Sequence, residues 1–551
     1  MSHPAQKPPT AREFSALTRS AQLDVLRRAG SRTRQRLLVD AADGEELLAL
    51  LPPQDVYLMA RELGADQIPE LLTMASPEQW TAFFDFDSWE GDSFDRRSAR
   101  AWLAILLQGE ESWVARTLLE LDFELLVLML FGEVRVLSGP EEMDDEAVMA
   151  DGRRRERGYV LDYLDDDGAK LFGDLINVLF RQAPDFCRYL LEAIRSEGES
   201  LLQETVFRQR ADRLLDQGFP EPHAAQAVYA WLDPETFVSG GEPKLSLGGS
   251  SSGVVPGAAL QLVRPRGVLA EALAGGVDDN TSWELACLVN KVLMAQQVDL
   301  GELDQVQAVV EQVYVTLNLA LEYLAGSDPE SAGRCLREDY AEKLFRLGFS
   351  LTLRLQRRAR AVQGSTVGPY LDRGDRELVA PLLQRRPLFP EVVVRPERGG
   401  TRPFAGLREV RLVEERLDRL EVQRRLFEEH FPFPLPEPEG WELENCHPQH
   451  GSELVLSTIF LTALANRVLG RAFSPQPLAA AELTELHARV SRGGKVDPEL
   501  RSRTLAWLES LEAGAGTFGE YCLGLWEEEF CAVSCAALDP RYVGGLIVRL
   551  A

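Results

Sequence analysis

The sequence has 551 residues, of which 45% are hydrophobic and 26% are charged. This balance is typical of a globular protein, and the length is sufficient for two or more domains. The formal net charge is −28, from 59 Lys and Arg against 87 Asp and Glu. Such a charge argues against a nucleic-acid partner, because most of the surface would repel phosphates.

The cysteines and the apolar segments predict a cytoplasmic protein without a membrane span. Seven scattered cysteines, an odd number, do not form the pattern of a disulfide framework. The N-terminal segment MSHPAQKPPTAREFS lacks the apolar region of a signal peptide. The two most apolar runs, at 118–131 and 454–470, are shorter than the roughly twenty residues that a spanning helix requires.

Residues 45–95 predict a series of short helices. Pro52 and Pro53 fit a helix start, because proline has no N–H to leave unpaired there. Ser76, Pro77 and Gln79 supply an N-cap, a first-turn proline and a capping-box acceptor. Helices this short cannot bury their apolar faces alone, so we expect them to stack in an array.

Two segments resemble those of a known family. The run PEQWTAFFDFDSWEGD at 77–92 resembles the signature of an uncharacterised bacterial family, the domain of unknown function number 6178. The run RADRLLDQGFPEPHAAQAVYAWLDP at 210–234 is similar to the segment that ends the N-terminal half of that family. The structural or interaction signature that we take from these runs is Trp80, Asp85, Asp87, Trp89, Asp92, Gly218 and Phe219. The resemblance implies an α-helical fold and transfers no catalytic residue, because no activity of the family is known.

A second resemblance concerns the helix starts LPPQD and SPEQW, over about residues 40–130. They resemble the intracellular N-terminal helical domain of MgtE-type magnesium channels and the related N-terminal domain of a flagellar switch protein. By analogy, this resemblance implies a docking or sensing role.

The acidic run DFDSWEGDSFD within the signature has two interpretations. Its carboxylates, including Asp85, Asp87 and Asp92, are of the type that binds Mg²⁺ or Ca²⁺. The interpretation that we favour is structural, with Asp87 or Asp92 capping the next helix and Trp89 filling the array.

The remaining chain predicts an all-α protein in two parts, with at most a small β-hairpin near Val160 and Tyr163. We expect a disordered tail at 1–10, a helical array at 11–237, a Gly/Ser/Pro linker at 238–257 and a second helical domain at 258–551. The second domain has longer helices, near 302–325 and 329–362. The alternating prolines of HFPFPLPEPEGW predict an extended segment at the surface.

A cluster of Cys and His near the C-terminus is the candidate metal site. A zinc ion fits a set drawn from Cys446, His447, His450, Cys531 and Cys535, because thiolates and imidazoles are its usual ligands. The competing interpretation is that these cysteines are small core residues. There is no Cys-x-x-Cys pair, and we expect no cofactor, with zinc as the alternative.

A literal GxGxxG occurs at Gly514, Gly516 and Gly519, but the preceding residues have the pattern of a helix. Because a dinucleotide fingerprint follows a strand, a turn between helices is the better interpretation.

These patterns favour a non-catalytic protein-interaction, scaffold or regulatory module with a protein partner. The alternative is a zinc sensor or an enzyme that uses the C-terminal Cys/His cluster. Neither the partner nor the oligomeric state follows from the sequence.

Overall fold

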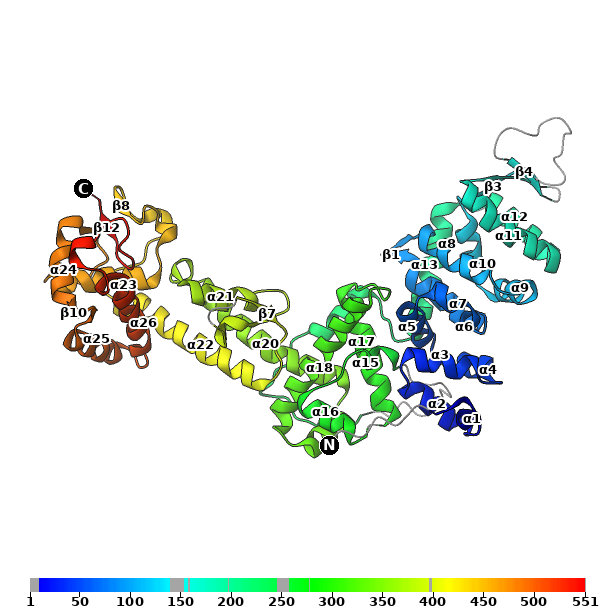
Figure 1. Ribbon diagram of the computed structural model, residues 1–551, viewed down its shortest axis with the longest axis horizontal. Coiled ribbons are helices and arrows are strands. Elements are labelled where there is room, and N and C mark those ends of the chain that lie inside the picture. Colours follow the sequence, from blue (N-terminus) through cyan, green and yellow to red (C-terminus); the bar gives the residue numbers. More distant parts are fainter. Residues whose placement is uncertain are drawn as a thin grey trace. The chain divides into compact units, whose positions relative to one another are not determined.

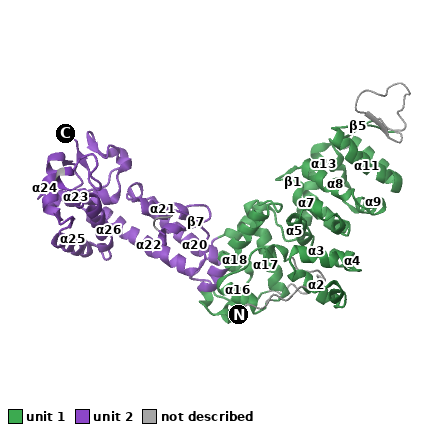
Figure 2. Cartoon of the chain, viewed as in Figure 1, with its two compact units in different colours: residues 1–230, 238–317, 324–346 green, residues 231–237, 318–323, 347–551 purple. Residues whose placement is uncertain are grey.

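Helices account for most of the described chain, so the all-α prediction is confirmed. The computed structural model describes residues 9–138, 153–156, 159–196, 198–244, 257–276, 278–395 and 399–550. Two compact units divide the chain (Figure 2). Unit 1 comprises 1–230, 238–317 and 324–346, and unit 2 comprises 231–237, 318–323 and 347–551. The predicted boundary at 238–257 stays a prediction, because residues 245–256 lie outside the described chain.

Unit 1 begins with short helices and continues with longer ones (Figure 1). The short helices are α1 (Ala11–Ser15), α2 (Arg19–Arg28), α3 (Ser31–Val39), α4 (Gly44–Ala49), α5 (Pro53–Leu63), α6 (Pro69–Leu72), α7 (Pro77–Asp87), α8 (Arg96–Leu106), α9 (Glu111–Glu120) and α10 (Phe123–Leu130). They are followed by α11 (Asp166–Gln182), α12 (Pro184–Ser196), α13 (Glu199–Asp216), α14 (Pro222–Ala225), α15 (Ala258–Gln261), α16 (Gly267–Ala274), α17 (Asp279–Gln296) and α19 (Pro329–Glu338). Helices α18 (Leu303–Ala325) and α20 (Ala341–Gln363) contribute residues to both units.

The start of α7 shows how sequence signals join neighbouring helices. The Ser76 hydroxyl accepts a hydrogen bond from the Gln79 N–H, and the Gln79 side chain accepts one from the Ser76 N–H, which confirms the predicted capping box. The Gln79 amide also donates to the carbonyls of Leu48 and Leu51, at 2.7 and 2.9 Å. One side chain therefore caps its own helix and satisfies carbonyls at the end of α4.

Asp85 of α7 is fully buried and is neutralised by Arg213 of α13. The guanidinium donates from Nε and Nη2 to the two carboxylate oxygens, both at 2.7 Å. The neighbouring Arg210 donates to the main-chain carbonyl of Asp85 and lies 5.3 Å from the centre of the Trp89 ring. The first signature run is thus joined to the second by a bidentate ion pair.

Asp87 is also held by side chains of the array. Its carboxylate accepts hydrogen bonds from the Tyr57 hydroxyl at 2.9 Å and from the Trp102 indole at 2.6 Å, and it pairs with Arg61. Both oxygens of this acid therefore have partners within the array.

The first residues of the predicted linker are anchored to the end of α19. The Asp339 carboxylate accepts hydrogen bonds from the Ser239 hydroxyl and from the Gly240 N–H. The Lys244 ammonium donates to the carbonyls of Leu336 and Asp339, at 3.0 and 3.2 Å. These contacts satisfy carbonyls at the C-terminus of α19. The helix predicted over 329–362 is two helices, α19 and α20, and these contacts lie at the break between them.

The described residues of unit 2 contain a part of α18, the second part of α20 and six further α-helices (Figure 1). These are α21 (Arg373–Leu382), α22 (Leu407–Arg425), α23 (Leu456–Val468), α24 (Leu483–Val490), α25 (Pro498–Leu511) and α26 (Gly516–Trp526). Its core includes a cluster of aromatic rings from Phe431, Phe460, Phe473 and Trp507. In five pairs of these rings the two centroids lie no more than 6.1 Å apart. Residues 431–433 form bends and residues 434–436 lie in neither a helix nor a strand, so the predicted extended form of this segment stays a prediction.

In the described residues the strands are short and form five small sheets, which is more β-structure than the single expected hairpin. Four of the five sheets consist of two-residue strands in loops, where no periodic pattern marks them. Unit 1 has β1 (Trp89–Glu90) with β2 (Ser93–Phe94), and the order β3 (Val134–Ser138), β5 (Tyr159–Tyr163), β4 (Arg153–Glu156). Unit 2 has β6 (Phe389–Pro390) with β7 (Thr401–Arg402), β10 (Ser491–Arg492) with β11 (Lys495–Val496), and the order β8 (Cys446–His447), β12 (Val548–Arg549), β9 (Leu478–Ala479).

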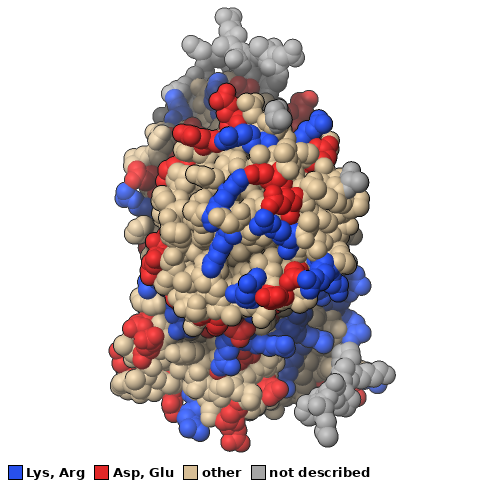
Figure 3. Space-filling model, turned by 90° about the vertical axis from the view of Figure 1, so that its left-hand side faces the viewer, with Lys and Arg blue, Asp and Glu red and all other residues tan. Residues whose placement is uncertain are grey.

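The surface is charged but mixed in sign on the face that Figure 3 draws, where basic and acidic side chains lie next to one another. In the described part of the chain, none of the helices combines the length and the apolar character needed to cross a membrane.

We expect the substitution Asp85→Ala to lower the free energy of unfolding of unit 1 by about 3 kcal/mol, because it leaves Arg213 without its main partner. Urea unfolding, with hydrogen exchange of peptides from α7 and α13, measures the effect. Asp92→Ala, at an exposed residue of the same signature, is the control and should change stability by less than about 0.5 kcal/mol. Equal unfolding of the two variants would show that the ion pair does not stabilise the array.

Candidate ligand-binding site

The predicted metal residues all lie in unit 2, in different local settings. Cys446 is buried in β8, and His447 pairs with Val548 of β12. His450 is exposed, and its N–H donates to Glu453. Cys531 is buried, which raises the pKa of its thiol to about 11, and Cys535 is exposed. Among the residues that the structure describes, no group of three or more His, Cys, Asp or Glu is arranged to hold a metal ion. The zinc site stays a prediction, which elemental analysis of protein purified without a metal-affinity tag would test.

The glycine motif forms a turn between α25 and α26 and follows a helix rather than a strand. Gly514 has a φ of +84°, which favours glycine. The Glu509 carboxylate accepts hydrogen bonds from the N–H groups of Gly514 and Gly516, at 2.9 and 3.0 Å. A side chain of the protein thus occupies the donors that a phosphate would need at this turn.

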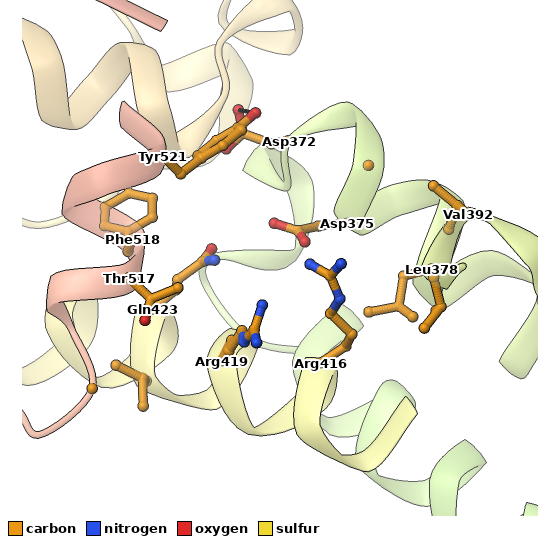
Figure 4. Close-up of a pocket in the computed structure, with 14 residues that line it drawn as sticks. Asp372, Asp375, Leu378, Val392, Arg416, Arg419, Gln423, Thr517, Phe518 and Tyr521 are labelled. Atoms are coloured by element: carbon orange, nitrogen blue, oxygen red, sulfur yellow. Dashed lines mark hydrogen bonds between the residues drawn. The ribbon is translucent and has the colours of Figure 1, made fainter. Parts of the chain in front are cut away.

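A pocket of about 350 Å³ lies beside this turn, between the N-terminal ends of α21 and α26 and one face of α22 (Figure 4). Its volume is within the range of about 300 to 1,000 Å³ that small-molecule sites occupy. The apolar part of its lining is Leu378, Val392, Val393, Val422 and Phe518. Charged and amide side chains also line the pocket, with acidic residues on one wall and basic residues on another.

The acidic wall begins with Asp372, the N-cap residue of α21. Its carboxylate accepts hydrogen bonds from the N–H and the hydroxyl of Ser457, at 3.2 and 2.5 Å, and from the Tyr521 hydroxyl at 3.3 Å. Burial raises the pKa of Asp372, and these hydrogen bonds oppose the rise. Asp372 therefore has partners from α23 and α26 and helps to fix both helices at the pocket.

Asp375 lies one turn further along α21, and its carboxylate points into the pocket (Figure 4). Burial, together with the nearby charge of Asp372, raises the pKa of Asp375 to about 7, while a hydrogen bond from Gln423 and the charge of Arg416 oppose the rise. At neutral pH this carboxyl is therefore present in both protonation states.

The basic wall consists of Arg416 and Arg419, which lie three residues apart on α22. Neither guanidinium forms an ion pair or a hydrogen bond with another residue of the described chain. The acids of the same helix are already used, because Glu414 pairs with Arg354, and Asp418 and Glu421 pair with Arg358. Two positive charges thus face the pocket without a carboxylate to neutralise them directly.

Gln423 lies one turn beyond Arg419 and is only 8% exposed. Its side-chain oxygen is buried and has no hydrogen-bond partner among the described residues. A buried amide oxygen without a donor is costly, so this atom is a position where a ligand donor would be stabilised.

Apart from Gly514 of the glycine motif, the sequence analysis did not single out the residues of this pocket. Asp372 with Asp375, and Arg416 with Arg419, each have the spacing of neighbours on one helix face. Charged residues on solvated helix surfaces commonly have the same spacing. A pocket is distinguished from such a surface by side chains that lack an ion-pair or hydrogen-bond partner, and only the fold reveals these.

Comparison with known proteins identifies a family. The model of a family described as a family of unknown function, DUF6178, matches residues 11–549. The matched range includes both signature runs and every residue of the pocket. No curated protein and no solved structure matches the chain.

We expect Asp375→Asn to stabilise unit 2 at pH 8 relative to the unsubstituted protein, and to do so much less at pH 5. The raised pKa of Asp375 means that the folded state keeps the proton of this carboxyl between about pH 4 and 7, where the unfolded state loses it. The contribution of Asp375 to the free energy of unfolding is therefore complete at low pH and is lost as pH rises through about 7. Asparagine does not ionise and avoids this loss.

Urea unfolding at the two pH values, with Glu377→Gln on the same helix as the control, measures the difference. A stability difference that is the same at pH 5 and pH 8 would contradict the assigned protonation of Asp375.

Proposed function

Because the chain belongs to DUF6178, a family of unknown function, we propose its function from the pocket: unit 2 binds a small organic molecule through an anionic group held by Arg416 and Arg419. The observation that carries the proposal is the lack of an ion-pair partner for these two guanidiniums among the described residues. A ligand site of this kind fits the regulatory module that the sequence predicts.

The chemistry of the lining supports this assignment. Guanidinium groups bind carboxylates and phosphates in fixed, often bidentate geometry, and adjacent arginines reinforce one another. The apolar lining, including Leu378, Val392 and Phe518, offers a surface for the non-polar part of the same molecule. The proposed role is therefore recognition of an organic anion.

A second candidate function is docking of a protein partner on unit 1. It is supported by the stacking of Tyr189 of α12 on Phe123 of α10, with ring centroids 4.7 Å apart and 65% of Tyr189 exposed. Exposed tyrosines backed by a rigid neighbour are frequent in protein interfaces.

We also propose a cytoplasmic location. All seven cysteines are within the described residues and are free. Free thiols persist in a reducing compartment, and this supports the proposal.

The anion site predicts that 3-phenylpropionate binds the full chain with a dissociation constant in the millimolar range, because the fragment makes few contacts beyond its carboxylate. The double substitution Arg416→Gln and Arg419→Gln should weaken binding by at least about 10-fold. Saturation-transfer NMR and calorimetry measure the affinity. Arg411→Gln, at an exposed arginine of the same helix outside the pocket, is the matched control. Retention of full affinity by the double variant would refute the proposed function.

The docking candidate predicts that a photo-crosslinking amino acid at position 189 forms an adduct of one defined mass in cells. The same amino acid at Tyr542, which is 82% exposed in unit 2, is the control and should give no such adduct. The substitution Phe123→Ser should abolish the adduct by removing the ring behind position 189. Adducts of equal yield at the two positions, or none at either, would count against docking at this surface.

A further inference from the structure

The pocket also offers acceptors to a ligand, one from α21 and one from α22. Asp375 points into the pocket from α21, and Gln423 lies beside it on α22 (Figure 4). The pocket therefore combines a basic wall, an acidic wall and apolar surface.

Gln423 is the observation that points to a ligand. Its buried side-chain oxygen has no donor within the described chain, while the same side chain forms a hydrogen bond with Asp375. An acceptor in this position is complementary to an N–H group that carries positive charge, because the neighbouring carboxylate attracts such a group.

Asp375 is the acid available for this role. Asp372 already accepts three hydrogen bonds, two from Ser457 and one from Tyr521. By contrast, no side chain within ion-pairing distance neutralises Asp375 in the described chain. A ligand cation would therefore meet Asp375.

Among the described residues that line the pocket, Arg416 and Arg419 are the cationic donors for the anionic half of the ligand. The N–H groups of Gly514 and Gly516 at the start of α26 are occupied by Glu509, so this helix terminus does not offer a free anion site. The guanidiniums of Arg416 and Arg419 remain.

We propose that the ligand is a zwitterion of the amino-acid type, whose ammonium donates to Asp375 and Gln423 while its anionic group is held by Arg416 and Arg419. For the anionic half, this inference rests on the proposed function. The side chain of the ligand contacts Leu378, Phe518 and the neighbouring valines, so an apolar amino acid is favoured over a polar one.

Binding of a zwitterion has a distinct proton signature. The charges that act on Asp375 are those of Asp372 at the start of α21 and Arg416 of α22. The charge of Asp375 in turn raises the pKa values of Tyr521 and Cys522 of α26, which are uncharged near pH 7. An ammonium beside Asp375 adds positive charge, lowers the pKa of this carboxyl and releases a proton near pH 7. A carboxylate ligand without an ammonium raises the same pKa and takes a proton up.

Three matched probes test the inference on the full chain: L-phenylalanine with both charges, 3-phenylpropionate with the carboxylate only, and 2-phenylethylamine with the ammonium only. We expect phenylalanine to bind at least about 10-fold more tightly than either single-charge probe. A pH electrode in weakly buffered solution at pH 7 should record proton release with phenylalanine and proton uptake with 3-phenylpropionate.

The substitution Asp375→Asn should cost phenylalanine at least about 10-fold in affinity and leave that of 3-phenylpropionate within about 2-fold. Equal affinity of phenylalanine and 3-phenylpropionate, with both lost in the double arginine variant, would overturn the zwitterion and leave the anion site intact. Failure of all three probes to bind would overturn the anion site together with the zwitterion.

Discussion

The buried carboxylate of Asp85 is the constraint on which the N-terminal array depends. It has no contact with solvent, and the arginine that neutralises it lies 128 residues further along the chain. A buried charge without its partner is strongly destabilising, so α7 and α13 must come together for either to be stable in place. The short helices around α7 are also held by polar contacts, because Gln79 joins α7 to the end of α4 and Asp87 joins it to α8.

The pocket of unit 2 has the opposite character. In unit 1 the acidic signature residues Asp85 and Asp87 are matched by nearby donors, whereas Arg416, Arg419 and the Gln423 oxygen lack partners within the described chain. The two arginines are exposed, so water solvates them, whereas the buried Gln423 oxygen reduces stability unless a donor satisfies it. The pocket therefore combines one buried acceptor without a donor and two cations that are accessible to a ligand.

Signals that act within a few residues could be predicted from the sequence. The proline and serine helix starts of α5 and α7 and the strand at β5 lie where their patterns indicate. By contrast, the partners of the break between α19 and α20 include Ser239 and Lys244, which lie about a hundred residues away in the sequence. The pocket depends on segments around Asp375, Arg416 and Tyr521 that share no local pattern. The sequence contains those residues, but they can be identified as a candidate binding site only when the fold shows that some of them lack partners.

The proline-rich segment after Phe431 has a further consequence for how the protein behaves at high concentration. Phe431 and Phe433 are buried, while the adjacent Pro432 and Pro434 are exposed. Proline has no N–H, so Pro432, Pro434 and Pro436 offer no amide donor to a strand of another molecule. Such a strand cannot form a complete ladder with this segment. The alternation of phenylalanine and proline thus inserts rings into the core and also protects the segment from edge-to-edge aggregation.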